Sequence, residues 1–132
     1  MQIFPSDDPM TALWDFLKPL AEELHVYKQV ADESEEDIPE SYLLVRANIT
    51  DAGAVYGDGR TLIRRNTADL LLVSKATGAR SDDVHNINIR KVNAFLSSAG
   101  DVAYSQRDLG YNATLKEAQY SWTVEFLYGK SN

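Results

Sequence analysis

A strict alternation of side chains over residues 119–128 limits the fold more than any other pattern in the chain. Large apolar residues alternate there with mostly polar ones, which is the period of a β-strand with one buried face. An aromatic stripe of this kind could stack on bases or sugars, but at strand spacing it more often forms the core face beneath a helix. We therefore expect a sheet that covers a core. The stripe consists of Tyr120, Trp122, Val124, Phe126 and Tyr128.

Two segments show helical spacing instead. Between residues 8 and 24 apolar side chains recur every three or four positions, with Pro9 in the first turn. Pro19 removes an interior hydrogen bond, so we expect one helix with a kink near this residue. A second helix is predicted to open at 81–83 and to end at Gly100. Its predicted inner stripe consists of Val84, Ile87, Lys91, Val92, Phe95 and Leu96.

Shorter alternating or apolar segments predict the remaining strands. Strands outnumber helices and the hairpin connections are short, which favours an α+β fold with a mainly antiparallel sheet. A chain of 132 residues has the size of one domain. We expect a single domain, 1–132, in which two helices pack on a sheet of about five strands. Besides 119–128, the predicted strands are 25–30, 41–50, 68–75, 102–107 and 111–115, the last two flanking a turn at 108–110.

Charge is distributed unevenly along the chain. Residues 1–40 hold eleven carboxylates against two lysines, whereas residues 41–132 hold nine carboxylates against eleven lysines and arginines. Tight binding to duplex DNA needs clustered cations, so a sequence-reading DNA-binding protein is not expected. The acidic run at 31–40 is predicted to be an exposed loop because its charges repel one another. It lacks the alternation and glycine of a calcium loop. Its candidate interaction residues are Glu33, Glu35, Glu36 and Asp37.

Residues 51–67 interrupt the periodicity with three glycines and form a predicted long Gly/Arg-rich loop between the second and third strands. Such a segment is either an extended hairpin tip or a mobile loop, and loops of this length are usually functional or disordered. A tight turn explains Gly57 and Gly59, since no phosphate-binding motif is present. The arginines are either solvated charges or a basic finger that meets an acidic partner, such as another copy. The candidate interaction residues are Tyr56, Asp58, Arg60, Arg64 and Arg65.

No residue pattern typical of catalysis is present. The chain has no cysteine, and His25 and His85 lack the spacing of metal ligands. A nucleophile elbow of the Gly-x-Ser-x-Gly type is also missing. We therefore expect no enzymatic activity, cofactor or metal. No apolar run approaches the roughly 20 residues of a membrane span, and no secretory signal is expected. A small ligand-binding or enzymatic domain is the alternative, which a deep pocket holding either histidine beside carboxylates would favour.

The layout of the whole chain carries a resemblance. An amphipathic helix leads to Val26-Tyr27, and an acidic stretch ends in Ile38-Pro39-Glu40-Ser41-Tyr42-Leu43-Leu44-Val45. The Gly/Arg loop, a helix closing with Val92-Asn93-Ala94-Phe95-Leu96, and Tyr120-Ser121-Trp122-Thr123-Val124-Glu125-Phe126-Leu127-Tyr128 follow. This order resembles the small tail completion proteins of long-tailed bacteriophages, also called tail terminators or tail-to-head joining proteins.

The resemblance implies a structural virion assembly protein without enzymatic activity. Such proteins form a ring, typically of six copies, on the head-proximal end of the tail tube. The ring stops tube growth and docks onto the head connector or stopper protein, and DNA passes through its bore without specific binding. An acid-rich face would let DNA slide, because like charges repel phosphates. The implied location is the head–tail interface of the virion after assembly in the host cytoplasm, with no membrane partner. A tail-tube or connector subunit is the nearest alternative.

Overall fold

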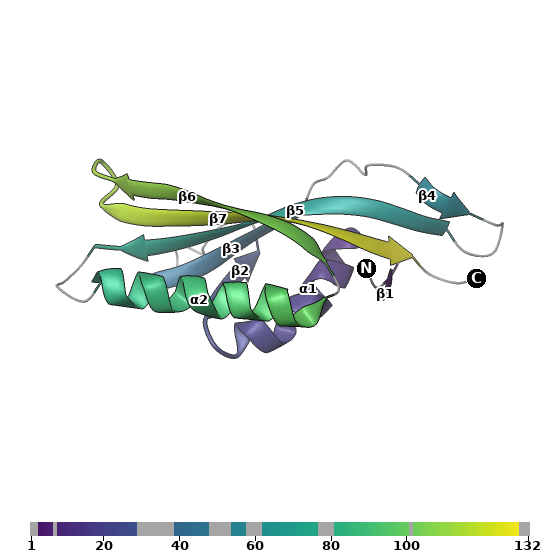
Figure 1. The fold of residues 1–132 in the computed structure, drawn as a ribbon, viewed down its shortest axis with the longest axis horizontal. Helices are drawn as coiled ribbons and strands as arrows, with labels where there is room; N and C mark the ends of the chain where they lie inside the picture. The colour runs from purple at the N-terminus through teal and green to yellow at the C-terminus, as the bar shows by residue number, and fades with distance from the viewer. Residues whose placement is uncertain are drawn as a thin grey trace.

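Two helices pack on the same side of a long, twisted sheet (Figure 1). The computed structural model describes residues 3–6, 8–28, 39–47, 54–57, 62–76, 81–100 and 102–129. Within these ranges the sheet has seven strands, and the α+β fold predicted from the sequence is confirmed. The elements in chain order are β1 (Ile3–Pro5), α1 (Pro9–Ala21), β2 (His25–Lys28), β3 (Ser41–Ala47), β4 (Ala54–Gly57), β5 (Leu62–Lys75), α2 (Ser81–Ala99), β6 (Ala103–Asn112) and β7 (Glu117–Gly129).

The sheet is mixed, so the expectation of a mainly antiparallel sheet is met only in part. Its strand order is β1-β7-β5-β3-β2, with β4 added to β5 and β6 added to β7. The long central strands pair antiparallel, whereas β1 runs parallel to β7 and β2 runs parallel to β3. A parallel pair needs a connection of about a dozen residues, and residues 29–40 supply that length between β2 and β3. The acidic run is therefore part of a crossover between parallel strands, and its structure lies outside the described residues.

The core lies between the helices and one face of the sheet. The stripe predicted on β7 is confirmed, since Trp122, Val124, Phe126 and Tyr128 are buried. From α1, the predicted face contributes Leu13, Leu17, Leu20 and the following Leu24. Fully burying such side chains stabilises a fold by about 1.5–3 kcal/mol each. This sandwich of helices on one sheet face accounts for most of the packing.

The start of α1 and the end of α2 follow the predicted signals, whereas α1 ends earlier than predicted. The Asp8 carboxylate caps α1 by accepting a hydrogen bond from the Thr11 N–H at 2.9 Å. Pro19 lies in the last turn of α1, which ends at Ala21. The helix therefore ends just after the proline instead of continuing, with a kink, to Leu24. Gly100 follows α2 with a φ of 68°, the left-handed conformation expected of a helix-ending glycine.

The described residues of the predicted loop at 51–67, which are 54–57 and 62–67, all lie in strands. β4 pairs antiparallel with the start of β5, with Tyr56 opposite Ile63 and Gly57 opposite Leu62. The extended hairpin, one of the two possibilities for this segment, is therefore the one observed. β5 begins six residues earlier than predicted because β7 offers it a partner as far as the pair Arg64 and Tyr128. The start of β5 thus pairs with β4 on one side and with the end of β7 on the other. We call these three paired segments the ribbon, which comprises residues 54–57, 62–66 and 126–129.

The predicted turn at 108–110 is also wrong, because β6 continues through it. The register of β6 on β7 shifts between Asp108 and Gly110, which marks a β-bulge. The Asp108 carboxylate accepts a hydrogen bond from the Gly110 N–H at 2.8 Å, and Gly110 has a φ of 76°. The chain reverses at 113–116 instead. An Asp-x-Gly sequence supplies the same local hydrogen bond in a bulge and in a turn, so the sequence alone did not distinguish them.

Candidate functional site

Most of the interaction residues predicted from the sequence lie outside the described part of the chain. Tyr56 is placed on β4, but only its backbone is described. Arg64 and Arg65 lie on β5, at the base of the ribbon. The predicted residues outside the described ranges are Glu33, Glu35, Glu36, Asp37, Asp58 and Arg60.

The two described arginines point to opposite faces of the sheet. Neighbouring side chains on a strand alternate, and Arg64 shares the face of the buried Asn66. Arg65 lies on the face away from the helices and forms an ion pair with Glu125, at 3.3 Å between Nε and Oε1. Both partners of this pair are about 40% exposed, so it adds little stability. Arg64 and Arg65 therefore do not share one face of β5, and Arg60, the third arginine of the predicted basic finger, lies outside the described residues.

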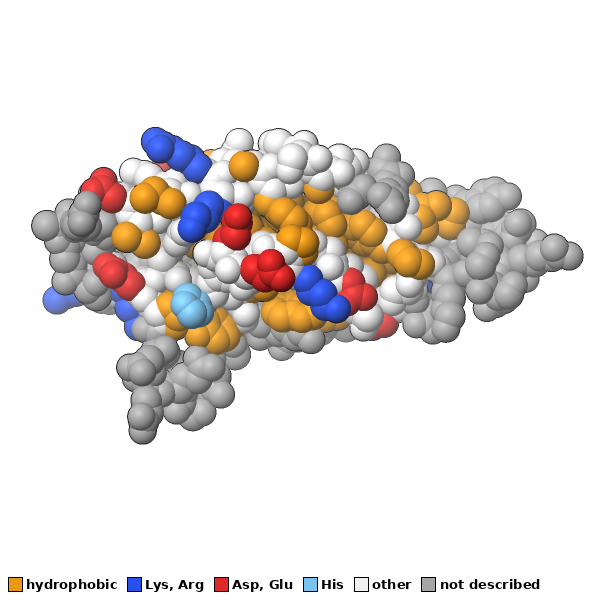
Figure 2. Space-filling model, turned by 90° about the horizontal axis from the view of Figure 1, so that it is seen from below, with side chains coloured by type: hydrophobic (Ala, Val, Ile, Leu, Met, Phe, Trp, Pro, Cys, Tyr) orange, Lys and Arg blue, Asp and Glu red, His pale blue; other side chains and the backbone are white. Residues whose placement is uncertain are grey.

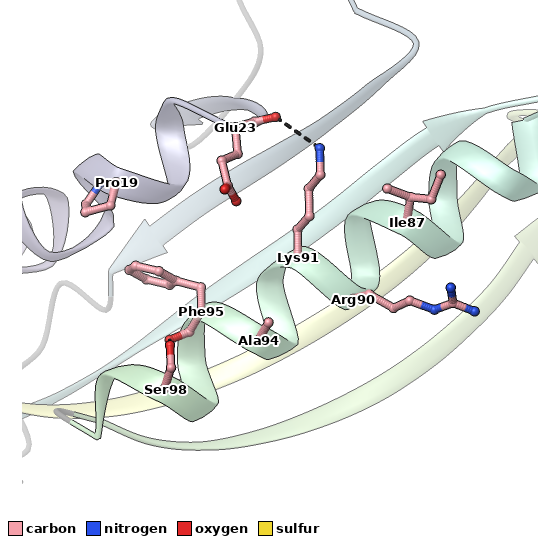
Figure 3. Close-up of a pocket in the computed structure, with 8 residues that line it drawn as sticks. All are labelled: Pro19, Glu23, Ile87, Arg90, Lys91, Ala94, Phe95 and Ser98. Atoms are coloured by element: carbon pink, nitrogen blue, oxygen red, sulfur yellow. Dashed lines mark hydrogen bonds between the residues drawn. The ribbon is translucent and has the colours of Figure 1, made fainter.

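An apolar groove runs between the two helices on the outer surface of the molecule (Figure 3). Its volume is about 600 Å³. The end of α1 forms one wall, and the Lys91 Nζ of α2 donates a long hydrogen bond of 3.5 Å to the Glu23 backbone oxygen. Arg90 adds a second cation to the rim. We call this the interhelical groove, and its lining residues are Pro19, Glu23, Ile87, Arg90, Lys91, Ala94, Phe95 and Ser98.

Hydrophobic side chains gather on this helix side of the molecule, with charged side chains between them (Figure 2). Ile87 is 49% exposed, although the sequence predicted it to face the core. Val92 and Leu96 are buried as predicted, but the helix is turned so that His85 and Asn88 are buried in place of Ile87. The four buried residues also have helical spacing, but two of them are polar. The predicted stripe therefore placed the apolar Ile87 in the core, whereas the structure buries the polar His85 and Asn88 instead.

A buried hydrogen-bonded chain explains why α2 turns polar residues inward. Ser74 Oγ lies 2.6 Å from His85 Nδ1 and 2.8 Å from Ser41 Oγ. Asn88 Nδ2 donates to Ser41 Oγ at 2.8 Å. The three contacts are mutually consistent when Asn88 donates to Ser41, Ser41 donates to Ser74, and Ser74 donates to His85 Nδ1. We call these four residues the polar cluster, and they tie α2 to β3 and β5.

The polar cluster contains a hydroxyl beside an imidazole, the pair that activates serine nucleophiles. Ser74 is only 3% exposed, however, so its hydroxyl is closed to a substrate. Every buried side-chain nitrogen and oxygen atom in the described ranges has a hydrogen-bond partner. His85 lacks the spacing of a metal ligand in the sequence, and its buried contact with Ser74 indicates a structural role.

A surface hollow of about 390 Å³ lies beside this cluster, where β2 and β3 begin. His25, Glu23 and Glu40 line it, and all three are exposed. The described residues contain no group of three His, Cys, Asp or Glu side chains that could hold a metal ion. No described helix is long and apolar enough to cross a membrane. The hollow brings a histidine near carboxylates, but on an open surface.

The sheet face opposite the helices combines an apolar end with a polar middle. Tyr42 and Val73 are buried on this face, and Tyr27 meets Tyr42 edge-on at 5.8 Å between ring centroids. Burial raises the pKa of Tyr42, and the nearby Glu117 carboxylate adds to this shift. Further along, Thr123 Oγ1 donates to Asp69 Oδ1 at 3.2 Å beside a hollow of about 310 Å³. We call this side the far face.

The described fold is thus an α+β domain whose two helices cover one face of a mixed sheet. No protein-family model matches the chain, and no curated protein matches it in sequence. The surfaces that the described fold offers to a partner are the ribbon, the interhelical groove, the far face and β6, which pairs with β7 alone among the described strands.

Proposed function

We propose that this protein is a structural subunit of a bacteriophage tail. In this proposal copies form a ring on the head-proximal end of the tail tube, stop tube growth and join the tail to the head connector. DNA passes through the bore of the ring without specific binding. The support comes from the order of elements along the chain, which resembles tail completion proteins, and from the surfaces that the fold leaves open.

The observation that carries the proposal is a sheet much longer than its main helix. β5 has 14 residues and spans about 46 Å at about 3.3 Å per residue. α2 has 19 residues and spans about 28 Å. The ribbon therefore extends past α2, as Figure 1 shows on the side of β4. The outer part of the ribbon, where β4 pairs with Leu62 and Ile63 of β5, is suited to reaching a neighbouring subunit.

A closed ring requires each copy to present two different surfaces that fit each other. The ribbon and the turn that joins β6 to β7 lie at opposite ends of the sheet (Figure 1). The charge distribution adds a second argument, since the first 40 residues carry most of the excess negative charge. An acidic surface toward the bore would repel DNA phosphates and keep the channel free of bound DNA.

Electron microscopy of the purified protein, alone and mixed with tail tubes, tests this proposal. We expect rings, and tubes with a single ring at one end. Long polymers made from the protein alone would instead identify a tail-tube subunit. Tubes that keep growing and carry no added ring would overturn the proposal.

The second candidate is a small ligand-binding or enzymatic domain, and the hollow that His25 shares with Glu23 and Glu40 is the observation that favours it. Its site would be open to solvent, which suits a polar small molecule more than an apolar one. Screening for ligands by thermal shift, with His25→Ala as the comparison, tests this candidate. A ligand whose stabilising effect disappears in His25→Ala would favour it over the tail protein.

A further inference from the structure

We propose that the hollow where β2 and β3 begin binds a small primary amine in its ammonium form. The inference names a ligand class for the second candidate function and rests on that candidate, not on tail assembly. The hollow, which we call the β2–β3 hollow, is lined from three segments that are distant in the chain. These are the connection from α1 to β2, the start of β3 and the first half of α2.

Backbone hydrogen bonds hold the walls of the β2–β3 hollow in place. After α1, the Glu23 N–H donates to the Leu20 oxygen at 3.0 Å. Before β3, the Glu40 oxygen accepts from the Lys75 N–H at 2.8 Å, which ties this wall to the end of β5. The volume of about 390 Å³ lies within the roughly 300–1,000 Å³ of small-molecule sites. The hollow is therefore a fixed feature of the fold with room for a small ligand.

The floor of the hollow offers a buried hydrogen-bond acceptor. Asn88 and Ser41 both line the hollow and are only 8% and 7% exposed. Asn88 Nδ2 donates to Ser41 Oγ at 2.8 Å, whereas no described residue donates to Asn88 Oδ1. Every fully covered side-chain nitrogen or oxygen in the described ranges has a partner, so Asn88 Oδ1 is not sealed inside the protein. It therefore opens into the hollow, where a ligand with an N–H or O–H group can donate to it.

Charge selects a cation over an anion. Glu23 and Glu40 are exposed and line the hollow, and among its described lining residues there is no lysine or arginine. The nearest lysine contact is that of Lys91, whose Nζ reaches the Glu23 backbone oxygen at 3.5 Å from the side of the interhelical groove. Two carboxylates beside one acceptor repel anionic ligands and attract a positive group.

An organic ammonium ion fits this lining better than a metal ion does. The described residues contain no group of three His, Cys, Asp or Glu side chains that could hold a metal. An ammonium group carries three N–H donors, which suit a single amide oxygen flanked by carboxylates. Leu24, Pro39 and Val84 add an apolar wall against which a short alkyl chain can pack. The ligand class is therefore a primary amine on a short carbon chain.

A titration followed by ¹H–¹⁵N NMR spectra of the full chain tests this inference at pH 8, where an ordinary histidine is neutral. The probe is n-butylammonium chloride, and the controls are sodium chloride at equal ionic strength and n-butanol. We expect saturable shifts of the Asn88 side-chain amide and of the backbone amides of 23–25 and 40–41 with the probe alone. Glu40→Gln should weaken this binding at least about fivefold. Glu22→Gln is the matched control, because Glu22 is an equally exposed carboxylate that does not line the hollow, and it should change the affinity less than about twofold.

The outcomes separate this inference from the second candidate function on which it rests. Shifts that do not saturate, or that n-butanol or magnesium chloride reproduces, would overturn the ammonium assignment. Equal weakening by Glu40→Gln and Glu22→Gln would also overturn it, because the effect would then come from general surface charge. A different ligand that stabilises the wild type but not His25→Ala, together with no response to the amine, would overturn the inference and leave the second candidate standing.

Discussion

Ser74→Ala tests the structural role of the polar cluster. Ser74 is the central member, because its hydroxyl contacts both His85 Nδ1 and Ser41 Oγ. Alanine removes one oxygen atom and leaves the surrounding apolar packing almost unchanged. The variant therefore isolates the hydrogen bonds that tie α2 to the sheet.

The expected magnitude follows from the two contacts. A buried polar group that loses its partner costs about 1–3 kcal/mol, and here two groups lose one partner each. Their effects overlap, because both depend on the same hydroxyl. We expect the free energy of unfolding to fall by about 2–4 kcal/mol. This is a large share of the roughly 5–15 kcal/mol by which domains are stable.

Urea unfolding followed by circular dichroism measures this loss. With a slope of about 2 kcal/mol per molar urea, the midpoint should fall by about 1–2 M. Ser105→Ala is the control, because it makes the same chemical change on an exposed strand position and should cost less than about 0.5 kcal/mol.

A Ser41→Ala, Ser74→Ala double variant adds a second check. Since the two hydroxyls contact each other, the double variant should lose less than the sum of the single losses. A Ser74→Ala protein as stable as the control would refute the view that this cluster secures α2.

Three further predictions concern the ribbon, the far face and the end of α2. Replacing Arg60, Arg64 and Arg65 by serine should leave the unfolding midpoint nearly unchanged, because the Arg65–Glu125 pair is exposed, but it should weaken ring or tube attachment in electron micrographs. The pKa of Tyr42 is raised in the folded state above the value of 10.0 that a tyrosine has in the unfolded chain. The folded protein therefore keeps the Tyr42 proton to higher pH than the unfolded chain does. The contribution of Tyr42 to stability is fully present below about pH 10 and is lost as the pH rises through the folded pKa. Urea midpoints measured from pH 8 upward should therefore fall less for Tyr42→Phe than for wild type, and parallel curves would contradict this. Gly100→Ala should cost about 1–2 kcal/mol of unfolding free energy, because alanine is strained at a φ of 68° although its Cβ would meet no atom within 4 Å; an unchanged midpoint would contradict this.

Side-chain spacing within one segment was enough to predict several helices and strands correctly. The alternation at 119–128, the Leu13, Leu17 and Leu20 face of α1 and the glycine after α2 all appear as expected, since each depends on spacing within one segment. The α+β class followed from the order of these elements. The candidate interaction residues stay predictions, and what the structure corrects is the placement of Arg64 and Arg65, which lie on opposite faces of a strand and not in a loop.

Contacts between distant segments decided the rest. β5 begins at Leu62 and not at Ala68 because β7 is there to pair with it, and nothing within residues 62–67 signals that partner. β2 and β3 pair in parallel, and the alternation of side chains within each strand does not encode the direction of pairing. The rotation of α2 that exposes Ile87 and buries His85 depends on two serines from β3 and β5, 44 and 11 residues away from His85 in the chain. A buried polar residue is stable only where its partner is present, and that partner is supplied by the tertiary structure.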